Sequence, residues 1–163
     1  MTTTVEQQQL AIQQVISAWQ IHNKRLNDML EKLSDDNLYN EVAPGRNRGT
    51  YLLGHLIAAN DSMVKLFGLG DKLFPSYETL FLSNPDNRDA SYPPAATLRA
   101  DWNNLNAFLE KHFAALTPNE WYAKHTAVSE ADFAANPQRN KLNVLINRTN
   151  HQAYHLGQLA FLL

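Results

Sequence analysis

The chain has 163 residues, with 16 acidic and 14 basic side chains and a formal net charge of −2. Hydrophobic residues make up 44% and charged residues 18%, a balance typical of one folded globular domain covering residues 1–163. The small negative charge argues against a nucleic-acid-binding protein that relies on bulk electrostatic attraction. Because the chain has no cysteine, disulfides, thiolate zinc sites and cysteine nucleophiles are excluded.

The sequence carries no sign of secretion or of a membrane span. Residues 1–10 are polar and rich in glutamine, without the basic start and apolar centre of a signal peptide. The longest apolar runs are far shorter than the roughly 20 residues that a membrane-spanning helix needs. We therefore expect a cytoplasmic protein without nucleic acid or membrane partners.

The first half of the chain predicts two helices and a long connection. Apolar side chains recur at helical spacing over residues 5–33 and again from Thr50, the expected N-cap of the second helix, to about Phe67. Residues 68–94 contain several prolines and form a long connection, either a crossover along a bundle or a lid over a site. The only strand-like segment of the sequence, residues 77–82, lies inside this connection.

The second half predicts two more long helices. Residues 98–116 repeat the apolar spacing, and a capping box at residues 117–120 then opens a short helical turn. The apolar pattern returns at Lys141 and continues to the end of the chain. Four such helices predict an all-α protein, a four-helix bundle in which facing helices can supply the ligands of a metal ion.

The histidines carry the functional signal. His151 and His155 are four residues apart, so both rings lie on one face of the fourth helix and can reach the same ion. A helical wheel places them at the margin of the core face, where a cleft between helices would open. His55, among apolar neighbours in the second helix, completes a set of three neutral imidazoles, the composition of a catalytic zinc-type site. The same residues also suit a packing role.

Residues 151–159 resemble the C-terminal signature of the DinB/YfiT-like superfamily of metalloenzymes, a helical His-x-x-x-His followed by Gly157, Gln158 and an apolar residue. The stretch from Gly54 to Leu56 resembles the part of that family that carries its first metal histidine. The resemblance implies a metal site at His55, His151 and His155 and a bundle with up-down-down-up order. That order needs a long crossover between the second and third helices. The resemblance also implies a homodimer, which many relatives form.

Other side chains are candidates for supporting roles, and no catalytic residue is assigned. Those that could orient the imidazoles or line a pocket are Gln158, Asp61, Asn60, Tyr154, His22 and His112. Arg46 and Arg48 precede the second helix, whose N-terminus favours anions, and are candidate contacts for a charged group of a substrate.

Three functional hypotheses follow. The first is a metal-dependent enzyme that acts on a small-molecule substrate with zinc, nickel or iron, either a hydrolase or a thiol S-transferase. Since the chain lacks cysteine, the thiol of a transferase would come from a low-molecular-weight cofactor, as in bacillithiol-dependent and mycothiol-dependent relatives. The second is a non-catalytic, stress-associated protein that binds a metal or another ligand. The third is a structural or dimerising bundle whose histidines only pack.

Overall fold

The structure, a computed structural model, describes residues 4–163, and every regular element in that range is a helix. The all-α prediction is therefore confirmed, while the first three of the polar residues 1–10 lie outside the described range. The long helices are α1 (Thr4–Lys32), α3 (Gly49–Leu66), α5 (Ala95–Ala115) and α8 (Lys141–Leu159). The short ones are α2 (Asp35–Leu38), α4 (Tyr77–Phe81), α6 (Pro118–Tyr122), α7 (Glu130–Ala135) and the 3₁₀ turn η1 (Ala160–Leu162).

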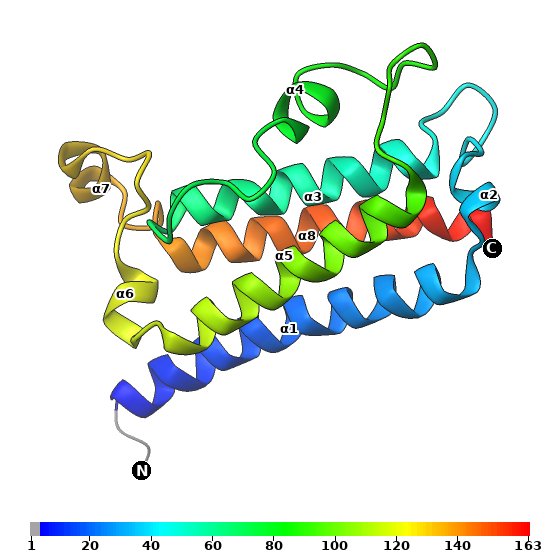
Figure 1. Cartoon of the computed structure of the whole chain (residues 1–163). Helices are drawn as coiled ribbons and strands as arrows, with labels where there is room; N and C mark the ends of the chain where they lie inside the picture. Colours follow the sequence, from blue (N-terminus) through cyan, green and yellow to red (C-terminus); the bar gives the residue numbers. More distant parts are fainter. Residues whose placement is uncertain (1–3) are drawn as a thin grey trace.

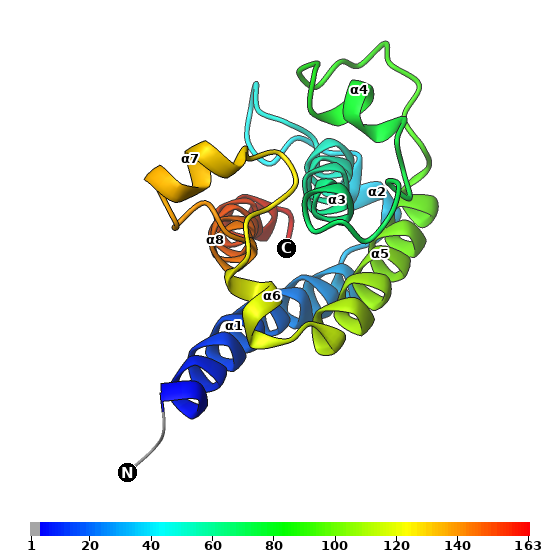
Figure 2. The same cartoon turned by 90° about the vertical axis from the view of Figure 1, so that its left-hand side faces the viewer.

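The four long helices pack side by side around a common core (Figure 1). Helix α1 contacts α8 and α5, and α3 contacts the same two helices. In Figure 1, α1 and α8 run from left to right, whereas α3 and α5 run from right to left. Figure 2 shows that α4 lies on the outer side of α3 and that α7 lies outside α8. None of the described helices is both long enough and apolar enough to cross a membrane.

Aromatic side chains from separate helices fill the core. Trp19 of α1 and Trp102 of α5 are fully buried, as their place on the apolar stripes predicts. Trp19 meets Phe113 edge to face, with ring centroids 5.2 Å apart. Each buried aromatic ring removes about 150–250 Å² from water, so these residues are large contributors to the stability of the helix packing.

The strand-like interpretation of residues 77–82 is wrong. The regular part of the connection between α3 and α5 is the helix α4. Tyr77 and Phe81 are four residues apart, so one helical turn places both on the side that packs on α3, and both are buried. The local β-propensity of this segment is overridden because no strand among the described residues is available to pair with it.

The start of α3 also differs from the prediction. Its N-cap is Arg48 rather than Thr50, and no side chain caps the helix. Thr50 lies inside the first turn and is buried, so its hydroxyl is not at the helix end. The amide of Gly49 instead donates to the carbonyl of Asn40, which ties the first turn to the preceding loop.

Candidate metal centre

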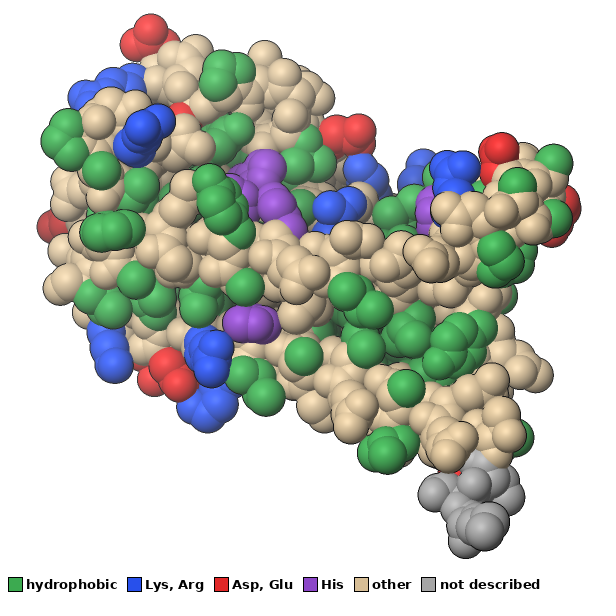
Figure 3. All heavy atoms as spheres, turned by 180° about the vertical axis from the view of Figure 1, so that it is seen from behind, with side chains coloured by type: hydrophobic (Ala, Val, Ile, Leu, Met, Phe, Trp, Pro, Cys, Tyr) green, Lys and Arg blue, Asp and Glu red, His purple; other side chains and the backbone are tan. Residues whose placement is uncertain are grey.

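The three predicted histidines lie together between α3 and α8. The Nε2 atom of His151 is 3.0 Å from the Nε2 atom of His55 and 3.0 Å from that of His155. One ligand atom from each residue lies within 4.8 Å of the other two. His155 is buried, whereas His55 and His151 are partly exposed. Figure 3 shows histidine side chains reaching the surface in the middle of the face behind that of Figure 1.

Hydrogen bonds to the outer nitrogens fix how two of these rings face the cluster. The Nδ1 atom of His55 lies 2.7 Å from the carbonyl oxygen of Phe81, and that of His155 lies 2.7 Å from Oε1 of Gln158. Since both partners are acceptors, each Nδ1 carries the proton and each Nε2 presents its lone pair to the centre. The amide of Gln158 is itself oriented, because its Nε2 donates to the hydroxyl of Tyr154 at 3.3 Å.

The resulting donor set fits a cation. Two lone pairs face His151 Nε2 at 3.0 Å, and a single proton on that atom can satisfy only one of them. A second proton on this ring is disfavoured, because burial and the neighbouring histidines lower the pKa of His151 to about 4. Burial likewise lowers the pKa of His155, which the hydrogen bond to Gln158 only partly opposes. Neutral imidazoles with converging Nε2 atoms are ligands that zinc, nickel and iron accept.

The carbonyl of Phe81 is available because Phe81 is the last residue of α4. The final carbonyls of a helix have no partner within the helix, and this one accepts from Nδ1 of His55, with the hydroxyl oxygen of Tyr51 3.3 Å away. The close approach of α4 depends on Gly54. A Cβ atom at that position would lie 2.4 Å from the Phe81 ring, so only glycine leaves room for it.

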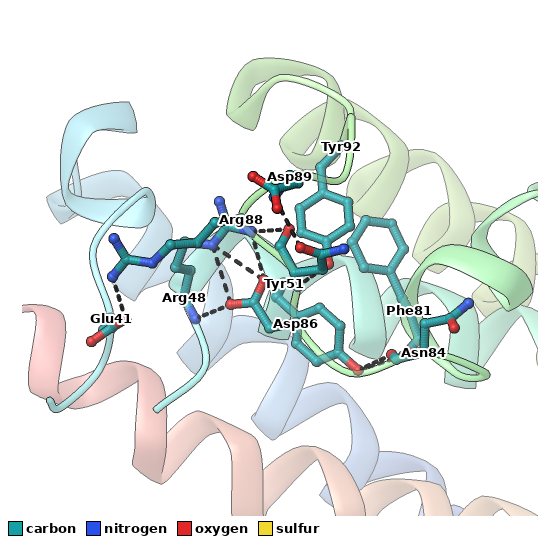
Figure 4. A network of polar contacts seen from close by, with 10 residues as sticks. Glu41, Arg48, Tyr51, Phe81, Asn84, Asp86, Arg88, Asp89 and Tyr92 are labelled. Carbon is teal, nitrogen blue, oxygen red and sulfur yellow. Dashed lines mark hydrogen bonds and ion pairs between the residues drawn. The ribbon is translucent and has the colours of Figure 1, made fainter. Parts of the chain in front are cut away.

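The connection is held at this place by contacts with the first turn of α3, shown in Figure 4. The hydroxyl of Tyr51 donates to the carbonyl of Asn84 at 2.8 Å. Arg48 pairs with Asp86 through Nη2 and Oδ1 at 2.6 Å and lies over the ring of Tyr92. Burial alone would raise the pKa of the Asp86 carboxyl, but the hydrogen bonds from Arg48 outweigh it and hold the pKa below its usual range.

The two arginines expected to contact an anion therefore differ in whether the protein already balances their charge. Arg48 already has the Asp86 carboxylate and the carbonyl of Asn87 as acceptors, so its charge is balanced within the protein. Arg46 is exposed in the loop before α3.

Of the residues predicted to support the histidines, Gln158 contacts an imidazole directly, and Tyr154 is exposed with its ring 5.0 Å from that of His155. Asn60 is fully buried and donates to Gln152 at 3.4 Å. Asp61 is also fully buried, and its carboxylate accepts the backbone N–H groups of residues 73 and 74, at 2.9 Å each. Asp61 thus fastens the start of the connection to α3.

The other two histidines in that group lie on different helices. His22 is on α1, where burial lowers its pKa. His112 is on α5, with its Nδ1 atom 2.8 Å from the carbonyl oxygen of Phe108 in its own helix. Among the described residues, the potential metal ligands that come together are His55, His151 and His155.

Fold and site together define an all-helical protein with a three-histidine cluster compatible with a metal ion. Residues 18–159 match the family model of the DinB superfamily, and the chain belongs to this superfamily. No curated protein matches the sequence. The matched range contains all three histidines as well as Gln158 and the connection that supplies the Phe81 carbonyl.

Proposed function

We propose that the protein is a metal-dependent enzyme that holds one divalent ion, zinc, nickel or iron, at His55, His151 and His155. The observation that carries this proposal is the convergence of the three Nε2 atoms, with the outer nitrogens of His55 and His155 committed to acceptors. A helix-packing role alone does not call for lone pairs that face one another at 3.0 Å.

A divalent ion at this place would act as a Lewis acid and hold an anionic nucleophile, water-derived or thiolate, at neutral pH. Burial favours the neutral form of His151 and His155, and hydrogen bonds to the outer nitrogens orient the rings of His55 and His155. Phe81 and Gln158 accept the outer protons of two rings, which raises their basicity as ligands. The partial exposure of His55 and His151 leaves one side of the cluster open for a small molecule.

The reaction is hydrolysis or transfer of a low-molecular-weight thiol. The chain has no cysteine, so a sulfur nucleophile must come from a separate thiol compound. The resemblance to a family that includes thiol-dependent enzymes favours the thiol reaction, whereas hydrolysis is favoured only by the general chemistry of a divalent ion held by three histidines. We also propose the up-down-down-up four-helix bundle for the chain, which the opposite directions of α1 and α3 and the long connection from α3 to α5 support.

Metal content tests the proposal. Chelator-treated protein titrated with Zn²⁺, Ni²⁺ and Fe²⁺ should take up about one ion per chain. A His55→Ala variant should lose this uptake, whereas the matched control His112→Ala should retain it, since His112 is outside the cluster. Uptake that is equal in wild type and His55→Ala would refute the site.

Turnover separates the enzyme from the non-catalytic, stress-associated alternative. The loaded protein should hydrolyse activated esters or amides, or conjugate a low-molecular-weight thiol to an electrophile, and His55→Ala should do neither. A protein that binds its ion at the three histidines but leaves both substrate classes unchanged would favour the binding function.

A further inference from the structure

One cation beside the three histidines has no acidic partner. Arg148 lies on α8, three residues before His151, and its Nη2 atom donates to the hydroxyl of Ser62 on α3 at 3.0 Å. Ser62 in turn is seven residues after His55 on α3. Since three and seven residues both return to the same face of a helix, Arg148 and the histidines lie along one seam between α3 and α8.

The guanidinium of Arg148 is poorly satisfied by the protein. Its Nε atom is buried without a hydrogen-bond partner, and no carboxylate of residues 4–163 forms an ion pair with it. Burial lowers the pKa of Arg148, because removing this charge from water is unfavourable. By contrast, Arg48 is also partly buried, but Asp86 balances its charge.

The position of this charge ties it to the histidine cluster. The backbone positions of Arg148 and His151 differ by an axial rise of about 4.5 Å along α8, whereas the guanidinium is held at Ser62, about 10.5 Å along α3 from His55. A molecule of several heavy atoms can bridge a span of this size. The positive charge of Arg148 also contributes to the lowered pKa of His151. Nδ1 of His151 is also buried without a partner among the described residues, and it would carry the ring proton when Nε2 binds an ion. Figure 3 shows Lys or Arg side chains beside the histidine group on this face.

We propose that Arg148 binds the oxyanion group, a carboxylate or a phosphate, of a small-molecule substrate whose reacting end lies at His55, His151 and His155. This inference rests on the proposed metal-dependent function. The planar guanidinium matches either oxyanion with paired N–H donors, and an anion would supply the negative charge that the protein itself does not place there. The proposal therefore narrows the substrate to an anionic small molecule.

The test uses the full chain loaded with Co²⁺, a paramagnetic ion, and measures relaxation of the ¹³C carboxyl signal of acetate and of the ³¹P signal of inorganic phosphate. Both signals report binding near the ion without any turnover. Wild type should give saturable relaxation by one of the two probes, and the probe with the higher affinity identifies the substrate's oxyanion. Arg148→Met should weaken that binding by at least about tenfold, with Co²⁺ uptake unchanged.

Two further variants make the result decisive. Arg139→Met, which changes an exposed arginine in the loop before α8, should bind the probe as wild type does. If Arg148→Met loses Co²⁺, Arg148→Lys replaces it and should weaken binding by at least about threefold, because an ammonium lacks the paired donors. Two results would overturn the role of Arg148 but leave the proposed metal site standing. One is equal probe affinity in wild type and a cobalt-loaded Arg148 variant, and the other is no saturable probe binding to cobalt-loaded wild type. If the wild type does not take up Co²⁺, the proposed metal-dependent function is itself wrong.

Discussion

Replacing Gly54 with alanine should damage the metal centre without touching a ligand. The new Cβ atom would lie 2.4 Å from two atoms of the Phe81 ring and 2.7 Å from a third. Ordinary carbon–carbon contacts are about 3.5–4.0 Å, so the ring must retreat by about 1 Å. It has little freedom to do so, because Phe81 is fully buried and its ring packs against those of Tyr51, Tyr77 and Tyr92.

Two separate losses follow from this shift. Overpacking of this kind costs about 1–3 kcal/mol of stability, of which the better helix propensity of alanine returns up to about 1 kcal/mol. Displacing Phe81 also moves its carbonyl away from Nδ1 of His55. Loss of such an outer contact weakens metal binding by about 10–100-fold, or about 1.4–2.7 kcal/mol.

Gly157 offers the matched control, since it lies in α8 between His155 and Gln158 and has nothing within 4 Å of a built Cβ atom. Gly157→Ala should raise stability by about 0.4–1 kcal/mol and leave metal affinity unchanged. The assays are urea denaturation of the metal-free protein and competition with a chromophoric chelator for Zn²⁺. Wild-type metal affinity in Gly54→Ala would refute the positioning of His55 by the Phe81 carbonyl.

Three further outcomes are expected. Gln158→Leu should weaken metal binding by about 10–100-fold in the chelator assay, because His155 loses its acceptor, and unchanged affinity would contradict the role of Gln158. Asp61→Ala should lower the urea unfolding free energy by about 1–3 kcal/mol, because two backbone N–H groups lose their acceptor, and a neutral result would show that water replaces it. In the metal-free protein, the folded pKa of His151 is lowered to about 4, whereas an unfolded histidine titrates near pH 6.5. The unfolded chain thus binds more protons in this window, so stability should fall as the pH drops from 6.5 towards 4. His151→Asn should flatten that slope in urea titrations, and an equal slope in the variant would exclude His151 as its source.

The sequence was sufficient for features that depend on spacing within one helix. The separation of His151 and His155 predicted their common face, and Gln158 was recognised as a neighbour on the same side. The apolar stripes predicted the four long helices and the burial of Trp19 and Trp102, because the 3.6-residue period survives in the folded protein.

Features that join distant segments could not be predicted in the same way. The acceptor for His55 is the backbone carbonyl of Phe81, and a backbone acceptor cannot be recognised from the types of residues in the sequence. Its position depends on α4, which local β-propensity presents as a strand and which becomes a helix by packing on α3. The pairing of Arg48 with Asp86 spans 38 residues, so the arginine resembled a free anion contact in the sequence. Arg148 did have a detectable signal, its position three residues before His151 on the same helical face.

The most direct test of the metal centre is a crystal structure of the zinc-loaded protein with anomalous diffraction recorded at the zinc edge. We expect one anomalous peak between α3 and α8, with Nε2 of His55, His151 and His155 each at about 2.0–2.1 Å from it. A peak at another place in the chain, or rings of these three histidines that stay unligated after loading, would contradict the account.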